Sequence, residues 1–260
     1  FRVVQNDKSH FLHQAVHGAE VFFMAWTTTP WTLPSNLGLT VGPSIEYVLV
    51  KTFNPYTHLP VNVVLAKALV HKYLKADNEN GDLAAYESRI AAGEQVKEGV
   101  PWQVMLSFKG SQLENLRYEQ LLPYEANSLE EIKKITPDAD PFRVLLGDFV
   151  TTEDGTGIVH TAPAFGADDY KVGKKYGIGI LTMVDREGKF VDGLGEFSGR
   201  YVKNYKDEKD YVDVNVDISV KLKLENRAFK VEKYEHNYPH CWRTDKPILY
   251  YPLDAWFIKT

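Results

Sequence analysis

One stretch decides the fold of this chain: Trp26-Thr27-Thr28-Thr29-Pro30-Trp31-Thr32-Leu33-Pro34-Ser35-Asn36. Its three consecutive threonines extend a β-prone run that begins at Val21. Pro30 ends the run because proline has no N–H to give to a sheet ladder. We therefore expect the hydroxyl groups of Thr27–Thr29 at the end of a strand, although β-branched filler at a strand end gives the same pattern.

A second stretch, much later in the chain, is the one that the first is expected to meet: Gly155-Thr156-Gly157-Ile158-Val159-His160-Thr161-Ala162-Pro163. Its glycines permit a close backbone approach or a positive φ, and Ile158-Val159 predicts a short buried strand that ends at His160. Asp168 and Asp169 then begin a predicted helix that ends at Gly177. A core histidine and a helix-capping carboxylate would produce the same features without any catalytic role.

The two stretches together, in this order, resemble the editing (connective polypeptide) domain inserted into isoleucyl-tRNA synthetases, which are class I aminoacyl-tRNA synthetases. A third block resembles the segment that leads the chain of that family back to its catalytic domain: His240-Cys241-Trp242-Arg243-Thr244-Asp245-Lys246-Pro247. The related valyl and leucyl enzymes carry an Arg-Pro after the threonines, where this chain has Thr29-Pro30-Trp31. The resemblance therefore covers nearly the whole chain.

Short β-prone runs separated by turn signals outnumber the helical patterns, which predicts a β-rich α+β fold. We expect a closed or nearly closed β-barrel core with peripheral helices. The resemblance divides the chain into a lead-in segment (1–20), an editing domain (21–235) and a return segment toward the catalytic domain (236–260). A polar stretch at about 77–99 has no counterpart in the family pattern and is expected to be a peripheral insertion.

One stretch gives two conflicting signals. Val212 to Leu224 carries an apolar residue at every second position, which is the pattern of a strand. The corresponding stretch of the resembled family is a helix that ends near Asn226. On that resemblance we expect a helix over Asp217–Asn226.

Composition limits the classes of function. With 44 per cent apolar and 13 per cent aromatic residues, a chain of 260 residues can bury a core. It has 35 acidic and 30 basic residues and a net charge of −5, so any RNA contact must use a local patch and not a global positive field. No apolar run reaches the roughly 18 to 20 residues that span a bilayer. We expect no membrane partner.

Metal and disulfide chemistry have little support in the sequence. Cys241 is the only cysteine, which excludes an internal disulfide and a cysteine-rich zinc site. It also fits a reducing compartment, and we expect a cytoplasmic protein. His10, His13 and His17 have a spacing that could suit metal ligands, but no acidic or cysteine partner completes a set. We expect no metal and no cofactor.

The resemblance implies an esterase reaction on RNA. Water attacks the ester that joins valine to the 3′-terminal ribose of tRNA(Ile), and no Gly-x-Ser-x-Gly elbow or zinc set indicates a covalent or metal mechanism. The implied partners are the 3′ end of tRNA(Ile) carrying valine and the catalytic domain of the same polypeptide, in a monomeric protein. The signatures of the ATP-using site, His-Ile-Gly-His and Lys-Met-Ser-Lys-Ser, are absent, so this chain alone should not bind ATP.

The resemblance also implies a role for each site residue. Thr29 and the binding residues should lie in the pocket around the terminal adenosine and the attacking water. Asp169 should hold the α-ammonium group of the amino acid. His160 should border the side-chain pocket and limit its size. We expect Thr29 and Asp169 to face one cleft. The binding residues implied are Trp26, which forms an apolar wall, and Thr27, Thr28 and Asn36.

Two other functions remain open at this point. The editing domain of a valyl-tRNA synthetase would hydrolyse threonyl-tRNA, but Trp31 stands where that enzyme has an acidic residue. A noncatalytic tRNA-docking module would have the same fold with a broken pocket, and the intact set of threonines, histidine and aspartate argues against it.

Overall fold

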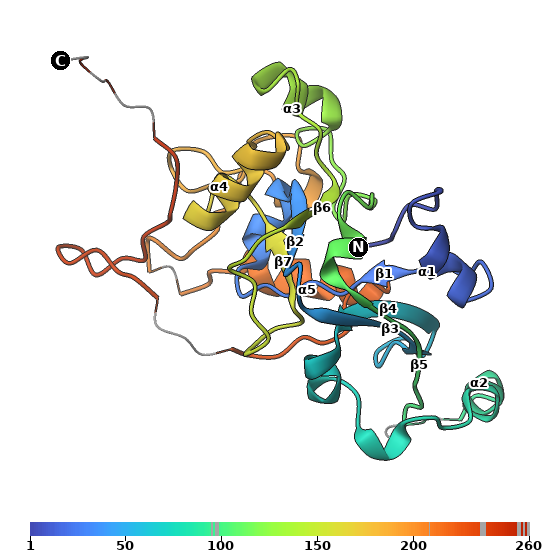
Figure 1. Cartoon of the computed structure of the whole chain (residues 1–260). Helices are drawn as coiled ribbons and strands as arrows, with labels where there is room; N and C mark the ends of the chain where they lie inside the picture. The colour runs from blue at the N-terminus through green and yellow to red at the C-terminus, as the bar shows by residue number, and fades with distance from the viewer. Residues whose placement is uncertain are drawn as a thin grey trace.

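The computed structural model describes residues 1–94, 96, 99–207, 209–234, 238–253, 256 and 258. These residues form two β-sheets with helices around them (Figure 1). The predicted α+β class is confirmed. Parts of the predicted insertion (95, 97 and 98) and of the predicted return segment (236, 237, 254, 255, 257, 259 and 260) lie outside the described residues.

The larger sheet has four strands in the order β1-β4-β3-β5. The central strands β3 and β4 are antiparallel and pair from Tyr47 with Ala66 to Phe53 with Pro60. The turn between them is closed by Asn54, whose Oδ1 accepts a hydrogen bond from the backbone N–H of Tyr56 at 2.8 Å. The strand bounds are β1, Phe22–Phe23; β3, Glu46–Phe53; β4, Pro60–Ala66; and β5, Gln103–Lys109.

The smaller sheet has three strands in the order β6-β2-β7. Its strands are β2 (Gly38–Val41), β6 (Arg143–Leu146) and β7 (Ile158–Thr161). Strand β2 is parallel to β6 and antiparallel to β7, and all its residues are buried. Because β2 follows the threonine stretch and β7 carries His160, this pairing brings the two predicted motifs together: Leu39 lies opposite His160.

The predicted closed barrel is not found, because the described strands form two separate sheets. The strands are short: β1 has two residues, and β2, β6 and β7 have four each. Such strands make few ladder hydrogen bonds, and the two sheets meet through core packing, single bridges and hydrogen bonds outside the ladders. The isolated bridges include Arg2 with Phe22, Val3 with Tyr118, Trp26 with Val159, and Arg117 with Arg143.

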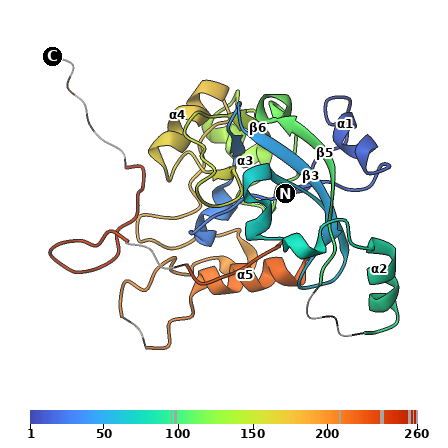
Figure 2. The ribbon, with the colours of Figure 1, turned by 60° about the horizontal axis from the view of Figure 1, so that its bottom comes forward.

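The α-helices lie around the sheets (Figures 1 and 2). Helices α3 and α4 lie on the side of the β6-β2-β7 sheet, and α2 lies at the periphery near β5. No helix of the described part of the chain is long and apolar enough to cross a membrane. The bounds are α1, His10–Ala15; α2, Leu83–Ala91; α3, Leu129–Ile135; α4, Ala167–Tyr176; and α5, Val214–Leu224. The longer 3₁₀ helices are η1, Pro30–Ser35, and η2, Lys67–Lys72.

The stretch with conflicting signals is helical. Helix α5 begins at Val214 and ends at Leu224, so the predicted helix is confirmed with its bounds moved toward the N-terminus. Every fourth residue faces inward, and Ile218 is fully buried. The apolar residues between them face outward, as Val216 shows with 58 per cent exposure. Alternation every second residue therefore produces two opposite apolar stripes on one helix, which is why the pattern resembles a strand.

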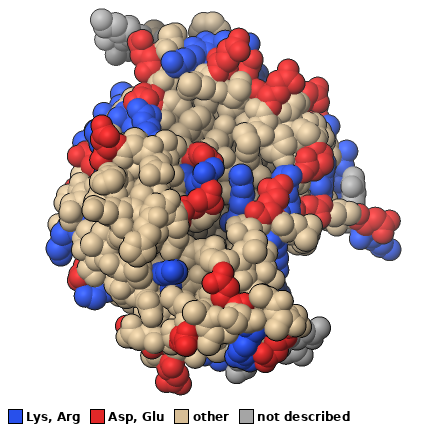
Figure 3. Space-filling view, turned by 90° about the vertical axis from the view of Figure 1, so that its right-hand side faces the viewer, with Lys and Arg blue, Asp and Glu red and all other residues tan. Residues whose placement is uncertain are grey.

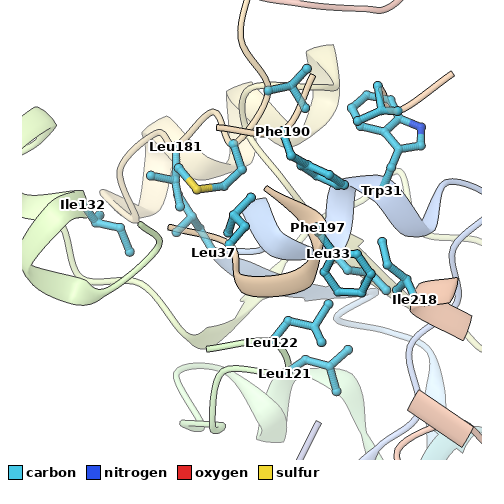
Figure 4. Packing of buried hydrophobic residues seen from close by; sticks show 14 of the residues in the cluster. Trp31, Leu33, Leu37, Leu121, Leu122, Ile132, Leu181, Phe190, Phe197 and Ile218 are labelled. Atoms are coloured by element: carbon cyan, nitrogen blue, oxygen red, sulfur yellow. The ribbon is translucent and has the colours of Figure 1, made fainter. Parts of the chain in front are cut away.

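Two hydrophobic clusters position the site. The first packs α5, η1 and the loops around them, and Figure 4 shows Leu33 and Phe197 beside Ile218. The second lies between the sheets and takes Tyr47 and Val64 from the larger sheet and Leu39 and Ile158 from the smaller one. The threonine stretch is thus held from both sides by packed cores.

The described part of the predicted insertion has a small core of its own. Helix α2 buries Tyr86 against Phe53 and Val96, and the Tyr86 hydroxyl lies 2.8 Å from Nδ1 of His58. This cluster lies apart from the other three. The division into segments 1–20, 21–235 and 236–260 stays a prediction.

Candidate functional site

The two predicted motifs line one cavity of about 410 Å³. The threonine stretch supplies one wall, and the histidine stretch with the start of α4 supplies the opposite wall. Thr29 and Asp169 face the same cavity, as the sequence predicts. The lining residues named in the prediction are Trp26, Thr27, Thr28, Thr29, His160 and Asp169.

The backbone fixes how the walls meet. The N–H of Trp26 donates to the carbonyl oxygen of Ile158 at 3.3 Å, which joins the start of the threonine stretch to β7. Pro30 then starts η1. The N–H of Trp31 donates to Oδ1 of Asn215 on α5 at 2.9 Å, so η1 is also anchored to a helix from the other end of the chain.

The threonine hydroxyls form a connected group at the cavity wall. Oγ1 of Thr27 accepts from the N–H of Thr29 at 3.0 Å, and Oγ1 of Thr29 lies 3.3 Å from Oγ1 of Thr32. The Thr32 hydroxyl donates to the carbonyl oxygen of Thr29 at 2.8 Å. Several polar oxygens therefore line this wall in fixed positions, as a site that orients water requires.

His160 is a buried, neutral side chain. Its Nδ1 lies 2.8 Å from the amide nitrogen of Asn36, and its Nε2 lies 3.0 Å from Oγ1 of Thr32. An amide NH₂ only donates, so Nδ1 accepts and the proton is on Nε2, which donates to Thr32. Burial lowers the pKa of His160 to about 4, and the hydrogen bond with Thr32 acts in the opposite direction. The imidazole is thus uncharged at neutral pH and held at both nitrogens.

Asn36 lies behind His160 and not on the cavity wall, which corrects its predicted place around the adenosine. It is 1 per cent exposed, and it lines neither this cavity nor the larger neighbouring cavity described below. Its amide nitrogen also donates to the carbonyl oxygen of Gly38 at 2.8 Å, and its Oδ1 accepts from the hydroxyl of Tyr118 at 2.7 Å. Asn36 thus contacts the cavity wall through its hydrogen bond to His160.

The two aspartates of α4 have different environments. Asp168 is exposed and pairs with Lys171 at 3.2 Å. Asp169 is partly buried, and its Oδ2 accepts from the N–H of Ala162 at 2.8 Å. Burial raises the pKa of Asp169 to about 6, the hydrogen bond from Ala162 lowers it, and the neighbouring Asp168 raises it further. Asp169 does not cap the helix, because Gly166 holds the N-cap position.

The glycines of the histidine stretch have the backbone that the sequence predicts. Gly155 and Gly157 have φ values of 68° and 75°. A Cβ atom on Gly155 would lie 3.0 Å from the ring of Trp26, and one on Gly157 would lie 2.4 Å from Cβ of Ala66. The ring of Trp26 also makes an edge contact with Tyr234 at 5.4 Å between centroids.

Some residues of the cavity wall were not predicted from the sequence. Thr32 belongs to the first stretch, and its spacing from Thr29 matches one turn of a 3₁₀ helix, which sequence reasoning could have used. Phe165 lies in the loop that leads into α4. The remaining wall comes from the segment after β6, namely Phe149, Val150, Thr151 and Asp154.

A larger cavity of about 890 Å³ adjoins the first, and both are lined by Trp26, Thr27, Thr28, Thr156 and His160. Its apolar lining comes from β1, β4 and the outward face of α5, which includes Val216 and Val220. Basic and acidic side chains alternate around it, such as Lys230 and Glu232, which form an ion pair at 2.8 Å. Among the described residues no group of three or more His, Cys, Asp or Glu could hold a metal ion.

No protein-family model matches the chain. Among solved structures, a leucyl-tRNA synthetase CP1 segment matches with a TM-score of 0.54 and 17 per cent identity, over 89 per cent of this chain and 93 per cent of that one. The chain therefore shares the fold of this leucyl-tRNA synthetase CP1 segment.

Sequence relatives make the identification narrower. The isoleucine–tRNA ligase of Cytophaga hutchinsonii is 51 per cent identical over 262 residues, which are 92 per cent of this chain and 22 per cent of that protein. That of Porphyromonas gingivalis is 46 per cent identical over 275 residues, which are 94 and 23 per cent. Over more than nine tenths of its length, the chain is similar to one segment of these isoleucine–tRNA ligases. It spans about a fifth of the length of these relatives.

Proposed function

We propose that the chain is the post-transfer editing domain of an isoleucyl-tRNA synthetase and hydrolyses the ester of valyl-tRNA(Ile) with a positioned water. The observation that carries this proposal is the convergence of the threonine wall, His160 and Asp169 on one cavity of about 410 Å³. The similarity of the chain to a segment of isoleucine–tRNA ligases supports the choice of substrate.

The wall of the cavity at His160 is proposed to give the discrimination. A hydrophobic pocket separates side chains that differ by one methylene only weakly, and isoleucyl-tRNA synthetases are the standard example of that limit. A second pocket that admits valine and excludes isoleucine overcomes it. His160 suits the excluding wall because hydrogen bonds to Asn36 and Thr32 hold both ring nitrogens and prevent the ring from moving aside.

Asp169 supplies the charge that recognises an amino acid. One carboxylate oxygen accepts from the N–H of Ala162, and the residue lines the cavity. At pH 7 the carboxyl group, with a pKa of about 6, is mostly ionised and can accept from an α-ammonium group. Peptide carbonyls or neutral ligands would gain less from this contact.

The chemistry rests on orientation. His160 cannot take a proton from water in this geometry, because its acceptor nitrogen Nδ1 already accepts a hydrogen bond from the amide of Asn36. The hydroxyls of the threonine wall, Thr29 among them, are proposed to hold the water against the ester carbonyl, with help from the ribose hydroxyl of the substrate. An ester needs less activation than an amide, so pre-organised donors can carry the rate.

The proposed partners are the 3′ end of tRNA(Ile) carrying valine and the catalytic domain of the same polypeptide, in a monomeric, cytoplasmic protein that uses no cofactor in this reaction. Figure 3 shows basic and acidic groups side by side on one face of the molecule, with no continuous basic patch there. With a net charge of −5, recognition of the RNA end is expected to depend on the cavity more than on a general positive field.

The test is a deacylation assay with three substrates: valyl-tRNA(Ile), isoleucyl-tRNA(Ile) and threonyl-tRNA(Val). We expect rapid hydrolysis of the first only. Hydrolysis of the third would support the valyl-type alternative. Trp31 argues against that alternative because it stands where the valyl enzyme has an acidic residue; in this chain its side chain is buried against the ring of Phe165, with 4.9 Å between the ring centroids. Binding of tRNA without hydrolysis of any ester would instead define a docking module.

A further inference from the structure

Tyr118 is a buried tyrosine outside both cavities, and yet it is connected to the cavity wall. Its side chain is 2 per cent exposed and packs edge-on against the rings of Phe1 at 5.3 Å and Phe142 at 6.3 Å. Its hydroxyl donates to Oδ1 of Asn36 at 2.7 Å. Burial raises the pKa of this hydroxyl well above its usual value, so the group stays protonated and remains a donor.

The three hydrogen-bond partners of the Asn36 side-chain amide are compatible with only one orientation of that amide. Oδ1 accepts from Tyr118, and Nδ2 donates both to the carbonyl oxygen of Gly38 and to Nδ1 of His160 at 2.8 Å each. A rotated amide would place its oxygen against the Gly38 carbonyl, where two acceptors meet, and its NH₂ against Tyr118. The tyrosine hydroxyl and the glycine carbonyl thus select the side of the amide that faces His160.

The direction of donation continues into the cavity wall. Because Asn36 donates to Nδ1, His160 carries its proton on Nε2 and donates to Thr32. Thr32 in turn donates to the carbonyl oxygen of Thr29. A single chain of donors therefore runs from the buried tyrosine to the threonine that faces the ligand.

We propose that Tyr118 is a positioning residue for this cavity: through Asn36 it fixes the Nε2–H tautomer and the ring position of His160, and with them the limit on amino-acid size. The proposal rests on the proposed function for its consequence in discrimination. The hydrogen-bond order itself is a property of the chain and can be measured without any substrate.

Tyr118→Phe removes one donor and keeps the ring. Oδ1 of Asn36 loses its donor, and only the Gly38 carbonyl still selects the orientation of the amide. In the molecules in which the amide rotates, its oxygen faces Nδ1 of His160 and requires an Nδ1–H tautomer. We expect the ¹⁵N NMR shifts of the two ring nitrogens of His160 to move toward each other, as in a mixture of the two tautomers. The ratio of valyl-tRNA(Ile) to isoleucyl-tRNA(Ile) hydrolysis should fall by about 3- to 10-fold, the loss expected for one neutral hydrogen bond.

Tyr86→Phe is the matched control. Tyr86 is also a buried tyrosine with one side-chain partner, His58, and it lines neither cavity. This variant should lose stability without any change in the His160 signals or in discrimination. Asn36→Asp is the second test, because a carboxylate only accepts and should impose the Nδ1–H form on His160 even if Tyr118→Phe fails to fold.

An unchanged Nε2–H tautomer in both Tyr118→Phe and Asn36→Asp overturns the proposal. So does a changed tautomer with an unchanged ratio, provided that the parent chain hydrolyses valyl-tRNA(Ile). A parent chain that hydrolyses neither ester overturns the proposed function, while the NMR result still decides whether Tyr118 sets the state of His160.

Discussion

The surroundings of the Asp169 carboxylate indicate what kind of ligand it can bind. Its carboxylate lies at the start of α4, where the positive end of the helix dipole favours the ionised form. It is not used for capping, and the exposed Asp168 beside it is paired with Lys171. A partly buried carboxylate in a cavity is suited to a cationic ligand.

The first prediction concerns this contact. Asp169→Asn keeps the shape and removes the charge, and the loss of one charge-assisted hydrogen bond should slow valyl-tRNA(Ile) hydrolysis by roughly 30- to 150-fold at low substrate. The tRNA ester of the α-hydroxy analogue of valine has no ammonium group and should be hydrolysed at nearly the parental rate. Rates measured for both esters with both proteins decide the matter, since equal slowing would mean that Asp169 serves the water or the fold.

The same substitution should affect stability in a pH-dependent way. Burial raises the pKa of Asp169 from 3.8 to about 6, so the folded state holds this proton more tightly than the unfolded state. Its stabilising effect is full below about pH 3.8 and is lost as the pH rises through 6. Asp169→Asn should therefore gain stability over the parent as the pH rises, by on the order of 2 to 3 kcal/mol at neutral pH. Urea unfolding at pH 4 and 7.5 measures this gain, and parallel curves would contradict it.

His160→Ala tests the steric wall. Removal of the imidazole should enlarge the cavity and allow hydrolysis of correctly charged isoleucyl-tRNA(Ile), while valyl-tRNA(Ile) is still hydrolysed. The measurement is the deacylation rate of both esters. If valyl-tRNA(Ile) hydrolysis is abolished and isoleucyl-tRNA(Ile) stays intact, His160 acts in the chemistry and not as a wall.

At the scale of residues, the sequence predicted the cavity lining where a motif contained it. The threonines, His160 and Asp169 all line one cavity. Asn36 was predicted to line the pocket but lies behind His160. The motif cannot show that the hydroxyl of Tyr118, far along the chain, donates a hydrogen bond to the amide oxygen of Asn36. Contacts between segments depend on the fold, so the order of donors behind His160 could not be deduced from spacing.

At the scale of elements, α5 shows the limit of periodicity. Seven apolar residues at alternate positions fit a strand and fit two stripes of a helix equally well. What decides between them is the environment: Val214, Ile218 and Leu222 pack into the first core cluster, and Asp213 caps the helix by accepting from the N–H of Asn215 at 2.9 Å. The barrel prediction was wrong for a related reason, since short β-prone runs do not reveal which strands pair.

The two stripes of α5 should differ sharply in energy. Ile218→Ala leaves a cavity at a fully buried position and should lower the free energy of unfolding by about 2 to 5 kcal/mol. Val216→Ala, at a position with 58 per cent exposure, should change it by less than about 0.5 kcal/mol. Denaturant unfolding of the two variants is the measurement, and similar losses would mean that the outer stripe is covered in solution.

At the scale of the whole molecule, the cavity lies where the two sheets meet. The hydroxyl of Tyr47 in β3 donates to the carbonyl oxygen of Gly157 at 2.5 Å, and the N–H of Ala66, the last residue of β4, donates to that of Thr156 at 2.8 Å. The larger sheet thus sets the start of β7, and β7 sets the position of His160. The arrangement of the site follows from the packing of two sheets and not from either motif alone.

This dependence gives the last prediction. Gly157 combines a φ of 75° with a Cβ position only 2.4 Å from Cβ of Ala66, so Gly157→Ala must move β7 away from β4. Gly177, at the end of α4, has a φ of 65° and no heavy atom within 4 Å of the position that a Cβ would take, so Gly177→Ala has only the backbone cost of about 1 to 2 kcal/mol. Both variants should lose thermal stability, Gly157→Ala more than Gly177→Ala. Only Gly157→Ala should also slow valyl-tRNA(Ile) hydrolysis when both are assayed well below their melting temperatures, because only its shift reaches His160. Equal rates for the two variants would show that the site tolerates movement between the sheets, and the packing of the sheets would then not control the geometry of the cavity.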